Sequence, residues 1–145
     1  MSEVVGYVPG LFDLFHVGHL DLLRRARAQC DRLIAGVFTD ELSRLVWGRD
    51  PYVSLPERME IVANVRYVDW AVPLARLDVR EICRELGFHK LFVGRTRIGL
   101  PAPEELQKLL EGTGVRVVAF PDERLSDSDV LRAALGGDPA QPSVA

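Results

Sequence analysis

The sequence contains very little lysine, very little cysteine and no long apolar run. Cys30 and Cys83 form neither a metal-ligand spacing nor a disulfide framework, so we expect two small buried thiols in a reducing compartment. The apolar run Leu33–Phe38 is six residues long, whereas a membrane-spanning helix needs ~20, and residues 1–3 do not begin a signal peptide. These absences exclude a disulfide-rich secreted scaffold and a membrane protein, and they predict a cytoplasmic protein.

Because lysine is scarce, the basic side chains are almost all arginine. Lys90 and Lys108 are the two lysines, so sixteen of the eighteen basic residues are arginine. Genomic base composition would explain this bias, and so would bidentate recognition of phosphate-like groups, which arginine performs better than lysine. Twenty-one acidic residues leave a net charge of −3, which argues against nucleic acid or a membrane surface as the partner. A local basic pocket remains compatible with this charge.

Length and composition fit one globular domain. The chain has 145 residues, of which 48% are hydrophobic and 27% charged. We expect this domain to span residues 1–135. Residues 136–145 are rich in glycine, proline and small residues, and two interpretations stay open: a flexible tail, or a linker into a further C-terminal domain.

Apolar runs alternate with amphipathic stretches along the chain. The runs predict strands over residues 4–8, 32–38, 67–72, 90–93 and 115–120. The amphipathic stretches predict helices over residues 18–29, 55–64, 78–86, 104–110 and 126–135. Ser54 and Glu57 have the spacing of a capping box at the start of one helix. This alternation predicts an α/β fold, a Rossmann-like doubly wound five-stranded parallel sheet with helices on both faces.

The segment Gly10–His19 directly follows the first predicted strand and reads Gly-Leu-Phe-Asp-Leu-Phe-His-Val-Gly-His. His16 and His19 are three residues apart at a helix start, so both imidazoles lie on one face of the first turn. Gly18 removes a side chain where a ligand would approach the backbone. A helix N-terminus with two imidazole donors predicts a phosphate site, although two surface histidines capping a helix are the simpler alternative.

The pattern Gly10-x-Phe12-Asp13-x-x-His16-x-Gly18-His19 resembles the signature of the His-x-Gly-His nucleotidyltransferases, in particular the small cytidylyltransferases typified by glycerol-3-phosphate cytidylyltransferase. The resemblance implies transfer of CMP from CTP, with Mg²⁺, to a small phosphate-bearing acceptor and release of pyrophosphate. It also implies a homodimer. No residue of the chain is predicted to be a dedicated metal ligand.

The same resemblance assigns roles to individual residues. His16 and His19 are the catalytic pair. Arg58 in the Glu57-Arg58 pair matches a family arginine and would contact phosphate. Arg95 and Arg97 are not part of the family pattern, but they follow the fourth predicted strand, where two arginines would form a second anion clamp. The predicted nucleotide-binding residues are Gly10, Leu11, Phe12, Asp13, Gly18, Arg49, Ser126 and Ser128, and the predicted acceptor- or phosphate-binding residues are Arg58, Arg95, Arg97 and Arg124. Each assignment has a structural alternative. Asp13 would instead form a turn, and Arg58 would form a salt bridge on the helix surface. Arg95 and Arg97 would be solvated charges of a loop.

Departures from the cytidylyltransferase pattern bear on the acceptor. The usual Arg-Thr-x-Gly run is replaced by the acidic segment 122–129, and a pair of arginines, Arg95 and Arg97, follows the fourth predicted strand. We therefore predict a 2-hydroxyethylphosphonate-like acceptor, as in the similar domains of phosphonate-antibiotic pathways, or glycerol 3-phosphate. Two alternatives stay open: an adenylyltransferase resembling phosphopantetheine adenylyltransferase, and a non-catalytic nucleotide-binding module.

Overall fold

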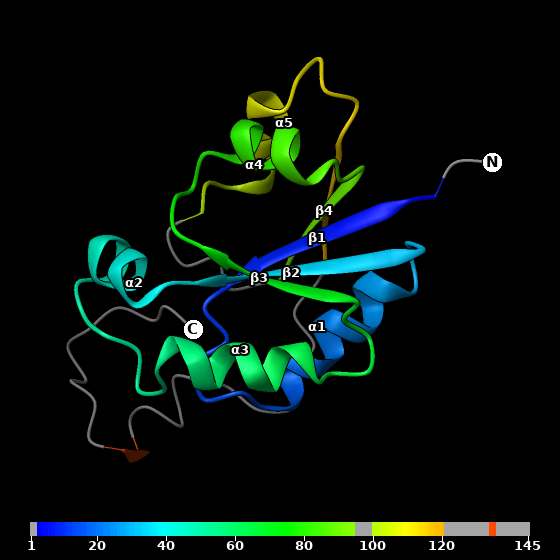
Figure 1. The fold of residues 1–145 in the computed structure, drawn as a ribbon. Helices are drawn as coiled ribbons and strands as arrows, with labels where there is room; N and C mark the ends of the chain where they lie inside the picture. The colour runs from blue at the N-terminus through cyan, green and yellow to red at the C-terminus, as the bar shows by residue number, and fades with distance from the viewer. Residues whose placement is uncertain (1–2, 95–99, 121–133, 136–145) are drawn as a thin grey trace.

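A computed structural model describes residues 3–94, 100–120 and 134–135 of the chain. Its sheet contains five parallel strands in the order β3-β2-β1-β4-β5, which confirms the predicted fold class (Figure 1). The strands are β1 (Val5–Gly10), β2 (Arg32–Phe38), β3 (Trp70–Leu74), β4 (Lys90–Val93) and β5 (Arg116–Ala119).

Helices cover both faces of this sheet (Figure 1). Leu23 and Ala26 of α1 and Val62 of α3 pack with Val8 and Phe92 in one apolar cluster. A second cluster on the opposite face joins residues of α4 and α5 to the sheet. The helices are α1 (Val17–Arg27), α2 (Asp40–Trp47), α3 (Leu55–Ala63), α4 (Val79–Leu86) and α5 (Pro103–Leu109).

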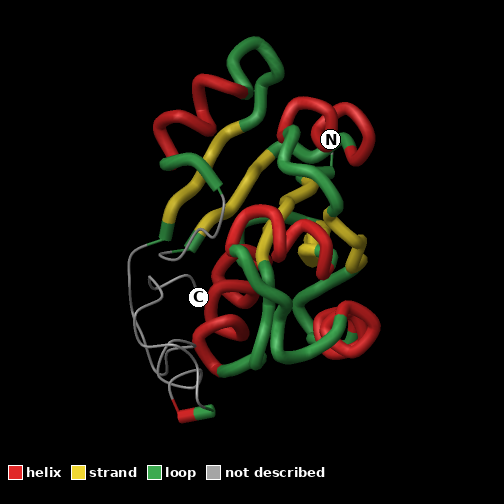
Figure 2. The backbone as a smooth tube through the Cα atoms, turned by 90° about the vertical axis from the view of Figure 1, so that its left-hand side faces the viewer, coloured by secondary structure: helices red, strands yellow, loops and turns green. Residues whose placement is uncertain are grey.

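The strand order reverses at β1, which pairs with β2 on one side and with β4 on the other. Ligands of such sheets bind outside the carboxyl ends of the strands, near this reversal. In Figure 1 strands β1, β2 and β3 run from right to left, so their carboxyl ends lie on the left, and Figure 2 views the molecule from that side. The loop that leaves β1 at Gly10 therefore occupies the expected ligand position.

Helix α2 was not expected from the sequence, and two local predictions are wrong. Thr39 caps α2 by accepting a hydrogen bond from the Leu42 amide at 3.0 Å, and the helix ends at Gly48 with φ of 83°. The capping box predicted at Ser54 is not formed, since the Ser54 side chain makes no cap hydrogen bond within the described residues. Strand β3 begins at Trp70 rather than at residue 67, because Tyr67 and the residue after it pack as loop against the α1–α3 cluster.

The helix predicted over residues 126–135 lies almost wholly outside the described residues. None of the helices in the described ranges has the length and apolar character that a bilayer crossing requires.

Candidate active site

The loop after β1 has an unusual backbone. Phe12 and Leu14 have φ of 54° and 52°, in the left-handed region that side-chain-bearing residues seldom adopt. Such residues cost ~1–3 kcal/mol each and persist where the surrounding structure holds them, often at functional sites. The Phe12 ring is buried and lies so close to Gly10 that a Cβ at residue 10 would come within 3.0 Å of it. A side chain at position 10 would therefore require the Phe12 ring to shift by a few tenths of an ångström.

His16 and His19 form a capping box at the start of α1. The Gly18 amide donates to His16 Nδ1 at 3.0 Å, and the His16 amide donates to His19 Nδ1 at 3.2 Å. Each Nδ1 is thus an acceptor, so a neutral ring carries its proton on Nε2. The two ring centroids lie 4.1 Å apart, and the ring planes are tilted by 31° relative to each other. The backbone of α1 therefore fixes the tautomer and the orientation of both imidazoles.

The simpler alternative, that the two histidines cap a helix, is confirmed, and a further role in binding phosphate stays a prediction. Both rings do cap α1, but a cap needs one acceptor atom per residue, and serine, threonine, aspartate or asparagine supply it more commonly. The histidines bring in addition two Nε2 donors next to the positive end of the α1 dipole. This arrangement can stabilise negative charge on phosphoryl oxygens.

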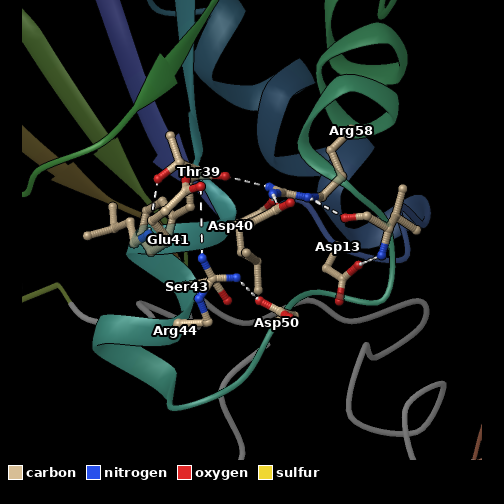
Figure 3. Close-up of polar contacts among 12 residues, drawn as sticks. Asp13, Thr39, Asp40, Glu41, Ser43, Arg44, Asp50 and Arg58 are labelled. Atoms are coloured by element: carbon tan, nitrogen blue, oxygen red, sulfur yellow. Dashed lines mark hydrogen bonds and ion pairs between the residues drawn. The ribbon is translucent and has the colours of Figure 1, made fainter.

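Asp13 is buried and joins the loop after β1 to the segment between α2 and α3. Its Oδ2 accepts from the Tyr52 amide at 2.9 Å. Its Oδ1 accepts from the Val53 amide, also at 2.9 Å (Figure 3). The bonds run to residues about forty positions away rather than to the turn around Asp13. Asp13 thus orders the site by holding two loops together, and neither bond is a direct nucleotide contact.

Arg58 lies fully buried at the first turns of α3, which corrects the predicted phosphate contact. Its guanidinium donates to the carbonyl oxygens of Leu11, Phe38 and Val53 at 2.7–2.8 Å and pairs with Asp40 at 2.6 Å (Figure 3). A guanidinium enclosed by backbone carbonyls has no open face for a phosphate. The alternative of a helix-surface salt bridge is correct in that Arg58 forms an ion pair with Asp40, but the Arg58 side chain is buried rather than on the surface.

Asp40 was missed as a site residue. It follows Thr39, the N-cap of α2, and it supplies the carboxylate that neutralises Arg58. The signal was present in the sequence, because Thr-Asp-Glu directly after an apolar strand is a helix N-terminus.

Arg49 belongs to the segment that Asp13 holds. Its guanidinium carbon lies 5.4 Å from the centroid of the Trp47 ring and 5.7 Å from that of the Tyr52 ring. Trp47 is buried, whereas Tyr52 is 38% exposed. The half-buried Arg49 guanidinium therefore lies between two aromatic rings near the carboxyl ends of the strands, where ligands of such sheets bind, and it can contact an anion there.

Other predicted site residues lie outside the described residues: Arg95, Arg97, Arg124, Ser126 and Ser128. In the described part of the chain, no three histidine, cysteine, aspartate or glutamate side chains gather as metal ligands. The Asp13 carboxylate accepts from two backbone amides, and the Asp40 carboxylate pairs with Arg58. Burial raises the pKa of the Cys30 and Cys83 thiols, so neither is primed as a nucleophile.

The fold, the loop at the strand-order reversal and the paired histidines are those of an α/β domain of the nucleotidyltransferase class. The chain belongs to the cytidylyltransferase-like family, whose model matches residues 7–139. This confirms the resemblance of the Gly10–His19 pattern to the His-x-Gly-His nucleotidyltransferases, while the glycerol-3-phosphate cytidylyltransferase type stays a prediction.

Relatives and solved structures agree with this assignment. The bifunctional protein HldE of Vibrio parahaemolyticus is 34% identical over 141 residues, which cover 94% of this chain and 29% of HldE. The HldE of Hydrogenovibrio crunogenus is 43% identical over 85 residues, which cover 57% of this chain and 18% of that protein. The chain thus spans less than a third of either relative.

Two solved structures share the fold. A lipopolysaccharide core biosynthesis protein from Thermoplasma volcanium superposes with a TM-score of 0.74 at 21% identity, covering 86% of this chain and all of that one. Pantoate-β-alanine ligase from Francisella tularensis superposes with a TM-score of 0.61 at 14% identity, covering 90% of this chain and 69% of that one. At these identities the likeness concerns the fold alone.

Proposed function

We propose that this domain transfers a nucleoside monophosphate from a nucleoside triphosphate to a small phosphate- or phosphonate-bearing acceptor and releases pyrophosphate. The observation that carries the proposal is the histidine capping box, which aligns two imidazoles at the positive end of α1. An acceptor oxygen attacks the α-phosphorus while the α-phosphorus–oxygen bond to pyrophosphate breaks. The imidazole Nε2 donors and the helix dipole then stabilise charge that develops on the phosphoryl oxygens.

The nucleotide that we propose is CTP, supported by the cytidylyltransferase-like description of the family. ATP is the second candidate, because the pantoate-β-alanine ligase of the same fold was crystallised with β,γ-ATP. Preference for CTP by tenfold requires only ~1.4 kcal/mol of differential contact, which a few hydrogen bonds to the base supply.

Mg²⁺ would accompany the triphosphate, since Mg²⁺ is commonly held by substrate phosphates with few protein ligands. For the acceptor, Arg49 is the described cation best placed to meet an anionic head group, because two rings hold it at the ligand edge. We propose glycerol 3-phosphate and 2-hydroxyethylphosphonate as the first acceptors to test. Arg49→Lys should raise the KM of the acceptor or the nucleotide, depending on which of them it contacts.

A pyrophosphate-release assay tests the proposal. The protein is incubated with Mg²⁺, with CTP or ATP, and with a panel of phosphate and phosphonate acceptors. His89→Asn is the matched control for histidine variants, because His89 accepts a bond from the Val5 amide at the opposite end of β1. Turnover with ATP and none with CTP would transfer the assignment to an adenylyltransferase. Nucleotide binding without turnover for any pair would favour the non-catalytic module.

The assembly is also a proposal. We propose a homodimer, and we propose that the domain functions as one module of a larger protein, because the HldE relatives are more than three times as long as the matched segment. Light scattering on the isolated domain tests the dimer, and a measured monomer mass would contradict it.

A further inference from the structure

The buried Arg58 ties three separate segments of the ligand edge together. Its donors reach the carbonyl of Leu11 in the loop after β1, that of Phe38 at the end of β2, and that of Val53 before α3. We propose that Arg58 is a positioning residue for nucleotidyl transfer, acting through the backbone that carries the histidine pair. This inference rests on the function proposed above.

Asp13 completes the arrangement from the other side. The Val53 amide donates to Asp13, while the Val53 carbonyl accepts from Arg58. Both the N–H and the C=O of Val53 are therefore hydrogen-bonded to these two side chains. The loop after β1 is fixed in turn at the Leu11 carbonyl and at the Asp13 side chain. We call these two side chains, Asp13 and Arg58, the clamp (Figure 3).

The clamp spans the strained part of the loop. Leu11 and Asp13 flank Phe12, whose φ is 54°, and Leu14 follows with φ of 52°. Left-handed residues of this kind relax unless their neighbours fix them. Only His16 and Phe15 separate Leu14 from the first residue of α1, so a relaxed turn would move the helix start and the capping box together.

Arginine suits this position better than lysine. The guanidinium spreads its donors in a fixed plane, and here they meet three carbonyls and one carboxylate. A lysine ammonium carries the same charge but cannot reach acceptors on three segments in that geometry. Arg58→Lys therefore preserves the charge that Asp40 balances and loosens the loop.

The experiment compares Arg58→Lys with Arg80→Lys. Arg80 is a matched control, because its guanidinium also donates to two carbonyls, those of Leu109 and Glu111, but on the α4–α5 face and exposed. We expect Arg58→Lys to lower kcat by ~10–10²-fold, the scale of catalytic misplacement, with the nucleotide KM within about threefold of wild type. Arg80→Lys should leave both parameters unchanged.

A second readout is independent of turnover. In ¹⁵N–¹H spectra, the amides of His16 and Gly18 report the two capping bonds directly. Both resonances should shift in Arg58→Lys and stay in place in Arg80→Lys. A residue with only a general stabilising role would lower the melting temperature, with wild-type kcat and wild-type resonances in the folded protein.

The outcomes separate this inference from the proposed function. An active wild type beside Arg58→Lys with unchanged kcat overturns the inference alone. A wild type inactive with every nucleotide and acceptor overturns the proposed function, and the inference falls with it. If Arg58→Lys does not fold, Asp13→Asn decides in its place, because it replaces one of the two oxygens that accept from the Tyr52 and Val53 amides: a lower kcat at constant nucleotide KM supports the clamp, and an unchanged kcat contradicts it.

Discussion

The two histidines at the start of α1 each contribute two separable properties, and substitutions that keep one and remove the other test the proposed site. His16→Asn keeps a favourable N-cap acceptor, and His19→Gln keeps the third-position partner of a capping box. Neither replacement supplies an imidazole Nε2 donor. The alanine variants remove the cap and the donor together.

The expected magnitudes follow from the bonds observed. Loss of the N-cap acceptor in His16→Ala should cost ~1 kcal/mol of unfolding free energy, which lowers the melting temperature of a domain this size by ~3 °C. Since Leu23 and Ala26 anchor α1 in the core, the helix should remain folded. Turnover should fall by ~10²–10³-fold in His16→Asn, His19→Gln and both alanine variants alike.

Thermal melts and the pyrophosphate assay on the same preparations check both properties. His89→Asn should match wild type in turnover. Wild-type turnover in His16→Asn or His19→Gln would refute the catalytic assignment of that residue. A melting temperature of His16→Ala equal to that of wild type would show that the observed cap bond contributes nothing.

The remaining predictions concern Tyr7, whose hydroxyl is buried and finds no hydrogen-bond partner in the described part of the chain. Tyr7→Phe should raise the unfolding free energy by ~1 kcal/mol, as it keeps the stack on Phe88 and removes an unsatisfied polar group; a lower value in denaturant titration would contradict this. Burial raises the pKa of the folded Tyr7 hydroxyl, so stability should decline as pH rises above ~10, and Tyr7→Phe should flatten that decline in alkaline melts. Gly36→Ala should destabilise by ~1–3 kcal/mol, because a Cβ there would lie 2.1 Å from the Tyr7 hydroxyl oxygen; wild-type stability would show that the ring moves aside freely.

The sheet and the histidine pair could be predicted from the sequence because each depends on a local pattern. Buried parallel strands leave near-continuous apolar runs, and β2 was predicted with its observed bounds, residues 32–38. The histidine spacing placed both rings on one helical turn, as observed. That both Nδ1 atoms would face the backbone did not follow, since it depends on the rotamers chosen in the folded loop.

The role of Arg58 could not be predicted, because it depends on residues twenty and forty-seven positions away. A Glu-Arg pair on a helix is equally compatible with an exposed ion pair, with a phosphate-binding arginine, or with a buried arginine that hydrogen-bonds several segments. Helix α2 was missed although its cap residues, Thr39 and Gly48, are local signals that the sequence contains. Tertiary burial, rather than local pattern, decided the role of Arg58.

The position of β1 at the centre of the sheet has a consequence for folding. β1 is the first strand in the chain, yet it pairs with β4, whose residues Lys90 and Leu91 lie 84 positions further along. A nascent chain that has emerged only through β3 can pair β1 on one side alone, leaving its other edge open. Such non-local pairing slows folding, because the loop-closure entropy must be lost before the contacts form. The loop after β1, which carries the histidine pair, therefore reaches its final enclosure only after β4 has been synthesised and has paired with β1.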